Sequence, residues 1–389
     1  MTLQEQLEAL CHGVTHIHSR AELEAKLKSG RQLRIKLGFD PSSPNLHIGH
    51  GQVLDKVAQF QKFGHKAIII IGDYTSRIGD PTGRSKTRVP LEPEQIAINA
   101  KTYIDQVFKI LDPDKTEIRS NSEWFDKLNY ADVLKLNAKI SVAQLLERED
   151  FKKRYTEGHS ITLTEFQYPL MQGYDSVQIK ADVELGGTDQ LFNNLVGRDL
   201  QRAEGMEPQV VMVVPLIVGT DGAQKMGKSL NNAVGILEPP EEIFGKTMSI
   251  SDETMKLWRE MLAPYYGLAP QAPEHPMEAK KELAQAFVAR FHGQEAATRA
   301  RADFEQKFSK RDLADIEMPE HTLGKDPVTL IKLLQDVGAV TSGSEARRLV
   351  TQGGVKLEGN KLTEPTAPVT LDKSSVLQVG KKFFVRLKV

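Results

Sequence analysis

The stretch RIKLGFDPSSPNLHIGHGQVLDKVAQFQKFGHKAIIII, residues 34–71, decides the fold. Its first six residues alternate as in a strand, a polar turn begins at Asp40, and apolar residues then recur near helical spacing from Ile48 until Gly64 stops the pattern. The run KAIIII, residues 66–71, is typical of a strand covered on both faces in a parallel sheet. Strand, helix and strand in this order predict a βαβ unit, and with it a Rossmann-like, doubly wound α/β fold.

Further along, the sequence divides into three parts. A second apolar run, VVMVVPLIV at residues 210–218, predicts another buried strand and leads into the polar loop GTDGAQKMGKSLNN. The pattern then becomes helical and charged, up to the proline-bounded segment MPEHTLGKDP, which we interpret as a linker. We therefore expect an α/β domain over residues 1–230, a small helical domain over residues 231–324 and an α+β domain over residues 325–389.

The last part should contain two helices, VTLIKLLQDVG and SEARRLVTQGG, the second opened by Ser344. Strand-turn-strand segments follow, VKLEGNKL and VLQVGKKFFVRL. From Lys325 onward the chain has 11 Lys and Arg against 6 Asp and Glu, a net charge of +5, whereas residues 1–324 carry −6. A basic tail on an acidic body indicates that the tail meets phosphate.

The composition excludes several classes of protein. One cysteine, Cys11, rules out an intrachain disulfide and a zinc cage built of cysteines. No apolar run approaches the length that spans a bilayer, and the start MTLQEQLEAL lacks the basic flank and apolar stretch of a signal peptide. We expect a soluble, cytoplasmic protein with no membrane partner.

Two histidines, His47 and His50, stand at the expected start of the helix that lies between the strands 34–39 and 66–71. Zinc would need further ligands, and no HExxH or cysteine pair accompanies them, so we expect no protein-bound structural metal. Core packing is a stronger alternative, because isolated histidines are often buried and hydrogen-bonded. In the third interpretation the two histidines bind phosphate. A helix start favours an anion, Gly49 and Gly51 let a ligand approach the backbone closely, and the imidazoles donate hydrogen bonds to phosphate oxygens. Such a site suits a nucleotide.

The motif KMGKS supplies a complementary part. Lys225 and Lys228 lie on a glycine-containing loop after a buried strand, so both ammonium groups can swing over a triphosphate and stabilise charge as pyrophosphate departs. A solvated lysine loop is the alternative. The solvated loop is the less favoured alternative, because the histidine pair is expected at the same end of the sheet.

Together, LHIGH and KMGKS resemble the two signature motifs of class I aminoacyl-tRNA synthetases, and the surrounding residues are similar to those of the bacterial tyrosyl-tRNA synthetases. The resemblance covers essentially the whole chain. It rests on KLGFDPSSPNLHIGH, IGDPTGRSKTR, VAQLLEREDFKKRY, YPLMQGYDS, GGTDQ, KMGKS and a C-terminal SGSEARRLVTQGGVKLEGNKL similar to the S4 RNA-binding domain. The three parts would then be a class I catalytic domain, a helical domain on the anticodon side of tRNA, and an S4-like domain.

The resemblance implies a tyrosine–tRNA ligase whose substrates are L-tyrosine, ATP accompanied by Mg2+, and tRNA(Tyr). The carboxylate of tyrosine attacks the α-phosphorus of ATP, giving tyrosyl-adenylate and pyrophosphate, and the terminal ribose of tRNA then takes the tyrosyl group. No protein nucleophile is needed, so catalysis is positioning plus electrostatic stabilisation. Members of the family pair through the catalytic domain, and we expect a homodimer.

The resemblance also implies which residues form the site. Those expected to be catalytic are Ser42, His47, His50, Lys225 and Lys228, with Ser229 as a helper. Those expected to bind ATP are Gly38, Asp40, His47, Gly49, His50, Gly187, Asp189 and Lys228. Those expected to bind tyrosine are Asp80, Tyr168 and Gln172 around its ammonium group, Gln190 near its carboxylate, and Asp175 as acceptor for its phenolic hydroxyl.

The spacing of the tyrosine-binding residues supports this assignment. Tyr168, Gln172 and Asp175 fall at i, i+4 and i+7, so one face of a helix can present all three to a pocket. Core packing is the alternative for Tyr168 and for Tyr174. A buried acceptor would reject phenylalanine, because phenylalanine would leave it unpaired.

Two positions depart from the family pattern. Lys36 stands where many members carry a tyrosine that also contacts the substrate hydroxyl, which puts that second contact in doubt. Gly227 replaces the commoner serine of the lysine loop and should make the loop more mobile without removing either ammonium group.

Several basic residues are candidates for contact with tRNA. Those that can approach the acceptor arm are Arg84, Lys86, Arg88, Lys152, Lys153 and Arg154, for which an exposed solvated face is the alternative. Those of the S4-like part are Arg347, Arg348, Lys381 and Lys382, which fit RNA recognition through phosphates and shape.

Other classes of protein share part of this pattern. A tryptophanyl-tRNA synthetase shares the fold and mechanism, but GGTDQ and the S4-like tail speak against it. A nucleotidyltransferase acting on a small molecule would not need the helical domain or an RNA-binding tail. A non-catalytic RNA-binding paralogue is disfavoured because both histidines and both motif lysines are intact.

Overall fold

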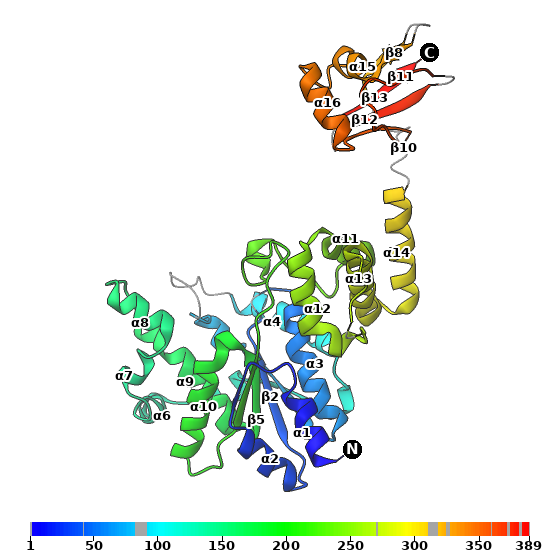
Figure 1. The fold of residues 1–389 in the computed structure, drawn as a ribbon. Helices are drawn as coiled ribbons and strands as arrows, with labels where there is room; N and C mark the ends of the chain where they lie inside the picture. The colour runs from blue at the N-terminus through cyan, green and yellow to red at the C-terminus, as the bar shows by residue number, and fades with distance from the viewer. Residues whose placement is uncertain are drawn as a thin grey trace. The chain divides into compact units, whose positions relative to one another are not determined.

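The computed structural model describes residues 2–41, 43–81, 92–269, 271–309, 318–323, 327–358, 360–371, 374–380 and 383–388. The chain folds into two compact units, Met1–Phe304 and Glu305–Val389. Figure 1 shows the first unit as a sheet flanked by helices and the second as a smaller set of strands beside two helices.

The first unit is built on a six-stranded sheet in the order β1-β6-β5-β2-β3-β4. The strands are β1 His16–His18, β2 Arg34–Phe39, β3 Lys66–Ile71, β4 Thr116–Ser120, β5 Val183–Gly187 and β6 Val210–Val214. The strands from β2 to β6 pair in parallel, and β1 joins β6 antiparallel. The order runs from β2 to β3 and β4 on one side and to β5 and β6 on the other. This confirms the doubly wound α/β fold and places the switch point between β2 and β5.

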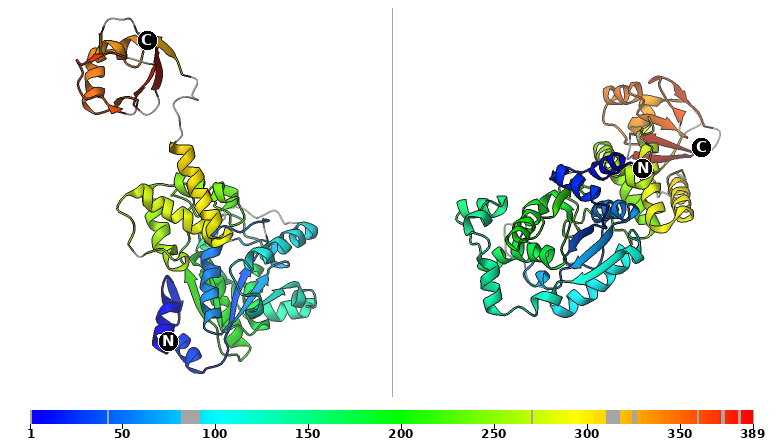
Figure 2. Two further views of the ribbon diagram at one scale, coloured as in Figure 1. Left: turned by 90° about the vertical axis from the view of Figure 1, so that its right-hand side faces the viewer. Right: turned by 90° about the horizontal axis from the view of Figure 1, so that it is seen from below.

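The β3 strand is covered on both faces, as its unbroken apolar run predicts. Ala67, Ile69 and Ile71 belong to the main hydrophobic cluster with α3, Ile48–Lys62. Ile68 and Ile70 pack on the opposite face, against residues that include Met171 of α9, Leu163–Gln178. Alternate side chains of one strand therefore hold the two helical layers, which the views of Figure 2 show on either side of the sheet.

The remaining helices of the sheet region surround these layers. They are α1 Leu3–Cys11, α2 Arg20–Lys28, α4 Pro93–Val107, α5 Ser122–Phe125, α6 Tyr130–Asn137, α7 Val142–Leu145, α8 Glu149–Thr156, α9 Leu163–Gln178 and α10 Leu191–Ala203. Four short 3-10 turns are η1 Thr75–Arg77, η2 Pro113–Lys115, η3 Thr188–Gln190 and η4 Lys228–Leu230.

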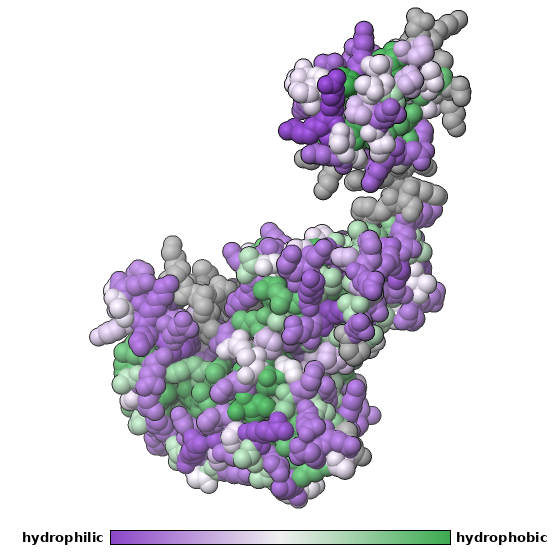
Figure 3. Space-filling view, in the orientation of Figure 1, coloured by the Kyte–Doolittle hydropathy of each residue, from purple (hydrophilic) through white to green (hydrophobic). Residues whose placement is uncertain are grey.

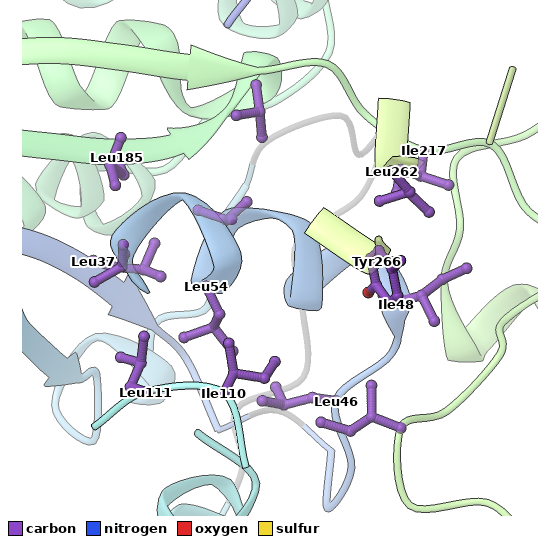
Figure 4. Packing of buried hydrophobic residues seen from close by; sticks show 14 of the residues in the cluster. Leu37, Leu46, Ile48, Leu54, Ile110, Leu111, Leu185, Ile217, Leu262 and Tyr266 are labelled. Carbon is purple, nitrogen blue, oxygen red and sulfur yellow. The ribbon is translucent and has the colours of Figure 1, made fainter. Parts of the chain in front are cut away.

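The helices between residues 240 and 309 share the hydrophobic cluster of the sheet. They are α11 Pro240–Ser249, α12 Asp252–Tyr266, α13 Pro276–His292 and α14 Gln294–Ser309. Figure 4 shows Leu262 and Tyr266 of α12 among the side chains that surround α3. A Cβ added at Gly51 of α3 would lie 3.3 Å from the Tyr266 hydroxyl oxygen, so a glycine allows this close packing. The domain boundaries expected at residues 230 and 324 stay predictions.

The second unit has its own hydrophobic core. A five-stranded sheet in the order β10-β9-β12-β13-β7 packs with the two helices α15 Leu330–Asp336 and α16 Gly343–Thr351. The strands are β7 Glu320–Thr322, β8 Val328–Thr329, β9 Val355–Leu357, β10 Asn360–Lys361, β11 Pro368–Val369, β12 Ser375–Val379 and β13 Phe383–Lys388, with β8 and β11 paired separately. The expected helix-helix-strand pattern is present.

Two boundaries differ from those expected. The apolar run 210–218 is strand only as far as Val214, since the next residue, Pro215, has no N–H for a ladder. The second helix of the C-terminal unit begins after Ser342, whose side chain accepts from the N–H of Glu345, and not at Ser344.

Candidate active site

A cavity of about 440 Å3 lies at the carboxyl ends of β2, β5 and β6, at the switch point of the sheet. It collects every expected catalytic, ATP-binding and tyrosine-binding residue that the structure describes. These are Gly38, Asp40, His47, Gly49, His50, Asp80, Tyr168, Gln172, Asp175, Gly187, Asp189, Gln190, Lys225, Lys228 and Ser229. Ser42 lies outside the described residues.

The two histidines lie together at the start of α3. The N–H of His47 donates to Nδ1 of His50 at 3.3 Å, and the ring centroids are 3.9 Å apart. Burial, and next the nearby Lys228 ammonium, lowers the pKa of His50 to about 4, and burial lowers the pKa of His47 well below its ordinary value. Both rings are therefore neutral near pH 7. Because Nδ1 of His50 accepts, its proton lies on Nε2, which remains a donor toward a ligand.

The start of α3 is joined to the chain beyond the lysine loop. His47 forms an isolated antiparallel bridge with Gly235, the N–H of Ile48 donates to the Val234 carbonyl at 3.0 Å, and the N–H of Ile236 donates to the Leu46 carbonyl at 3.1 Å. One N–H of the first helical turn is thus already used within the protein. The same bridge brings two motifs that are far apart in sequence to one cavity.

Asn232, a residue that the sequence did not single out, holds the lysine loop. Its side chain is buried, its oxygen accepts from the N–H of Gly227 at 2.8 Å, and its nitrogen donates to Asp221 at 2.8 Å and to the Lys225 carbonyl at 3.2 Å. Met226, between the two lysines, is buried in the main cluster. These contacts fix the base of the loop and leave the two lysines at the cavity.

Lys225 forms an ion pair with Asp189 across the cavity. The distance from Nζ to Oδ2 is 3.1 Å, and about half of the Lys225 side chain is exposed. A lysine expected at the phosphates therefore contacts, in this structure, the carboxylate expected at the ribose. Burial lowers the pKa of the Lys228 ammonium group.

At the deep end of the cavity, Asp175 is buried on α9. Its Oδ1 accepts from Nε1 of Trp124 at 2.9 Å and its Oδ2 from Nδ2 of Asn121 at 3.4 Å. Burial raises the pKa of Asp175 to about 7, while the Lys36 ammonium and these two hydrogen bonds oppose the rise. A buried carboxylate can accept a hydrogen bond from a hydroxyl that enters the pocket.

Tyr168 lies in the wall of the cavity, and Tyr174 packs in the core. The Tyr168 hydroxyl donates to Oδ2 of Asp40 at 2.8 Å, while Oδ1 of Asp40 accepts from Thr75 at 2.8 Å. The Tyr174 ring lies 5.8 Å from that of Phe125, between their centroids. Core packing, left open for both tyrosines, describes Tyr174.

A chain of side-chain amides crosses the cavity floor. Nε2 of Gln190 donates to Asp80 at 2.8 Å, and Nδ2 of Asn193 donates to Oε1 of Gln190 at 3.2 Å and to Oε1 of Gln172 at 3.0 Å. Asn193 is buried. Three residues expected around the ammonium and carboxylate of tyrosine are thus held in one network.

Glycines keep part of the cavity open. A Cβ added at Gly38 would meet nothing within 4 Å, whereas one at Gly72 would lie 2.2 Å from Oδ1 of Asp40 and one at Gly187 2.7 Å from Leu216. A side chain at Gly38 would occupy ligand space, and one at either other position would displace a wall residue.

Sequence reasoning missed several residues of the site. They are Thr75, Asn121, Trp124, Asn193, Asn232 and Glu184, which is the buried partner of Lys36, a residue that the sequence did single out. Three of them follow the carboxyl ends of β3 and β4, where ligands of this fold bind, and that rule was the available signal. A glutamate inside the apolar strand β5 was another.

The basic residues considered for tRNA divide into three groups. Arg347 and Arg348 are exposed on α16, and Lys152 and Lys153 are exposed on α8. Arg154 is different from the expectation: it is buried and forms an ion pair with Glu165, so it supports the local fold. Those outside the described residues are Arg84, Lys86, Arg88, Lys381 and Lys382.

The described part of the chain gives no sign of two other kinds of site. No group of three or more His, Cys, Asp or Glu side chains in it is arranged to hold a metal ion. None of its helices has both the length and the apolar character needed to cross a membrane.

A doubly wound sheet, a histidine pair at the first helix of the switch point and a lysine loop bridged to it define a class I aminoacyl-tRNA synthetase. Residues 28–309 match the family described as tRNA synthetases class I (W and Y). The chain is 49% identical to the tyrosine–tRNA ligase of Moorella thermoacetica, over 98% of this chain and 95% of that one, and 49% identical to that of Aquifex aeolicus, over 100% and 99%. It belongs to the tyrosine–tRNA ligase family, which confirms the enzyme class expected from the sequence.

Solved structures agree on the fold. A C-terminally truncated mitochondrial tyrosyl-tRNA synthetase from Aspergillus nidulans superposes with a TM-score of 0.64 at 22% identity, covering 79% of this chain and 94% of that one. The tyrosyl-tRNA synthetase of Archaeoglobus fulgidus, solved with L-tyrosine, gives 0.61 at 21% identity, covering 77% and 100%.

Proposed function

We propose that the cavity activates L-tyrosine with ATP and then esterifies the 3′ end of tRNA(Tyr). In the first step a carboxylate oxygen of tyrosine bonds to the α-phosphorus, the bond from that phosphorus to the bridging oxygen breaks, and pyrophosphate leaves with the electron pair. In the second step a hydroxyl of the terminal ribose attacks the tyrosyl carbonyl and AMP departs. Mg2+ enters as part of the ATP substrate.

The observation that carries this proposal is the meeting of two different ends in one cavity. Asp175 offers a buried acceptor at one end, and His47, His50, Lys225 and Lys228 offer donors and cations at the other. An amino acid with a phenolic hydroxyl fits between them, with its carboxylate toward the cations. The Archaeoglobus fulgidus neighbour, whose structure contains L-tyrosine, supports this choice of amino acid.

The remaining residues receive roles by position. Asp80 lies at the space expected for the amino-acid ammonium group, Gln190 at that for its carboxylate, and Asp40 at that for the ribose side of ATP. The neutral His50 donates from Nε2 to a phosphate oxygen without adding charge to the empty site. Lys228 and Lys225 stabilise the charge that develops as pyrophosphate leaves.

The direct test is pyrophosphate exchange into ATP with each amino acid in turn. Exchange should depend on L-tyrosine. Exchange with tryptophan instead, or without any amino acid, would overturn the assignment. Charging of tRNA(Tyr) by the same preparation tests the second step and separates a ligase from a paralogue that only binds RNA.

We further propose that the active form is a homodimer joined through the first unit. Five large apolar residues are exposed within a short stretch of that unit, Tyr130, Leu134, Val142, Tyr155 and Leu163. Figure 3 shows hydrophobic surface on this unit in the area where Figure 1 places α9 and α10. Burial of such side chains favours association. Light scattering at working concentration should give twice the mass of one chain, 43.4 kDa, and a monomer would contradict the proposal.

A further inference from the structure

A buried lysine lies directly behind the tyrosine pocket. Lys36, on β2, is 0% exposed, so its side chain is out of reach of a substrate. The register of the sheet sets Lys36 beside Glu184 of the neighbouring β5, and the two form an ion pair with 2.8 Å between Nζ and Oε1. Burying two charges is costly unless the surrounding groups complete their hydrogen bonds, so the pair needs a reason to be there.

The ammonium group makes two more contacts, both with α9. It donates to the backbone carbonyl of Gln172 and to the hydroxyl of Ser176, each at 2.7 Å. With Glu184, these two acceptors use all three of its N–H groups. Asp175 lies in the turn between the two acceptors. The lysine therefore fixes the turn of α9 that presents Asp175 to the cavity.

This turn follows a break in the hydrogen bonding of α9. Pro169 is inside the helix and has no N–H to give to the preceding turn. A helix interrupted in this way depends more on outside contacts for its exact course. The ion pair beneath α9 supplies such contacts one turn later.

Lys36 also acts on Asp175 by its charge. Burial is the largest influence on the pKa of Asp175 and raises it, whereas the Lys36 ammonium is the largest influence that lowers it. Glu184 acts in the opposite direction but more weakly than Lys36. Neutral donors from Trp124 and Asn121 face the carboxylate from the side of α5.

Other acidic groups face the pocket from further away. Asp40 and Asp80 lie beside Tyr168, and Tyr168 is on α9, the helix that also carries Asp175. They make the pocket negative and oppose ionisation of another carboxyl. Lys36 is a buried cation close enough to Asp175 to oppose this effect.

We propose that Lys36 is a positioning residue that sets the preference for tyrosine over phenylalanine, by fixing the turn of α9 around Asp175 and by placing a positive charge behind that carboxylate. The inference rests on the proposed function of the cavity. Many relatives are expected to have at this position a tyrosine that contacts the substrate. Lys36 instead acts from beneath the pocket, through α9 and Asp175.

The test compares wild type and Lys36→Met in the full-length protein by pyrophosphate exchange with tyrosine and with phenylalanine. The ratio of kcat/KM for tyrosine to that for phenylalanine should fall at least about tenfold, because a protonated Asp175 holds a phenol less strongly and loses less when the hydroxyl is missing. The KM for tyrosine falls as pH rises through the pKa of Asp175, and in Lys36→Met this inflection should move to higher pH.

A second variant guards against a failure to fold, since Lys36→Met leaves Glu184 buried and unpaired. Lys36→Met with Glu184→Gln removes both charges and should fold, yet it should keep the lowered discrimination and the shifted inflection. The matched control is Lys26→Met, which removes another buried lysine whose ion pair with Glu207 lies away from the cavity. This control should retain wild-type discrimination and pH profile.

The outcomes separate the inference from its foundation. If wild type does not exchange with tyrosine, the proposed function fails. If wild type does exchange and either Lys36 variant keeps the wild-type ratio and inflection, Lys36 has no role in selectivity. If Lys26→Met shifts both quantities as much as Lys36→Met does, the effect is a general loss of structure and the inference is also overturned.

Discussion

The buried carboxyl of Asp175 lowers the stability of the folded protein, and its proposed role is to select tyrosine. Its pKa of about 7 is above the ordinary 3.8, so the folded state binds a proton that the unfolded state releases. The stability it contributes is fully present below the unfolded pKa and is lost as pH rises through the folded pKa. The proposed binding of a phenol would be a use for a group that weakens the empty protein.

Asp175→Asn should therefore be more stable than wild type at pH 8, by roughly 2–4 kcal/mol from the size of the pKa shift. The difference should shrink toward zero near pH 4, where Asp175 of the folded wild type is protonated and, like the asparagine of the variant, uncharged. Thermal or urea unfolding across this pH range measures it. A constant difference over the whole range would show that the carboxyl does not titrate as described.

Lys228 should matter to the transition state more than to binding. Lys228→Met should lower kcat for tyrosine activation by about 10²- to 10³-fold, with a smaller change in KM for tyrosine, because the charge it stabilises develops as pyrophosphate leaves. Single-turnover formation of tyrosyl-adenylate measures the step. Lys256→Met, on the exposed face of α12, is the control and should leave the rate unchanged.

At this scale the sequence predicted which residues line the cavity and missed how they are held. His47, Asp175 and Lys225 follow from motifs that can be read along the chain. Asn232 and Asn193 could not be found in that way, because each acts through side-chain hydrogen bonds that depend on how the loop and the helices are folded. Contacts of this kind exist only once the fold is formed.

Among the elements, the loop that carries KMGKS depends on one amide. Asn232→Ala removes the acceptor of the Gly227 N–H and the link to Asp221, so the base of the loop loses its fixed shape. We expect kcat for activation to fall about tenfold or more, since reacting groups must be held in place. Limited proteolysis should also cut the loop faster.

Asn231→Gly is the matched control for this variant. Asn231 is exposed and has a φ of 51°, a left-handed conformation that glycine adopts without strain. Its replacement should leave both the rate and the proteolysis unchanged. If Asn232→Ala behaved like Asn231→Gly, the clamp would be irrelevant to catalysis.

Elements were predicted best where their pattern was strongest. β2 and β3 were found with their observed bounds, and α3 within a residue or two, because a strand, turn and helix of this kind have clear periodicity. The run at 210–218 was read as too long because hydrophobicity continues past Pro215, where the ladder stops. α1 and α2 were missed, although Thr2 and Ser19 cap them.

For the whole molecule, the two units have separate hydrophobic clusters, which indicates that each can fold alone. A chain that ends at residue 317 should keep tyrosine-dependent exchange within about twofold, because every described site residue precedes that point, but lose charging of tRNA by about 100-fold or more. Loss of both activities would show that the first unit needs the second.

The control for truncation keeps the chain intact. Arg347→Ala with Arg348→Ala removes two exposed cations of α16. It should weaken tRNA binding and lower its dependence on salt, while exchange stays unchanged. An unaltered salt dependence would argue against phosphate contact by this helix.

The bridge between His47 and Gly235 limits how the lysine loop can open. The loop is held between its two lysines, where the N–H of Met226 donates to the Ile217 carbonyl, and at its exit, where the N–H of Ile48 donates to the Val234 carbonyl. The backbone of the loop is therefore held at two points, and its exit is joined to the start of α3. Amide protons of Ile48 and Ile236, which donate across this junction, should therefore exchange with deuterium as slowly as those of the sheet.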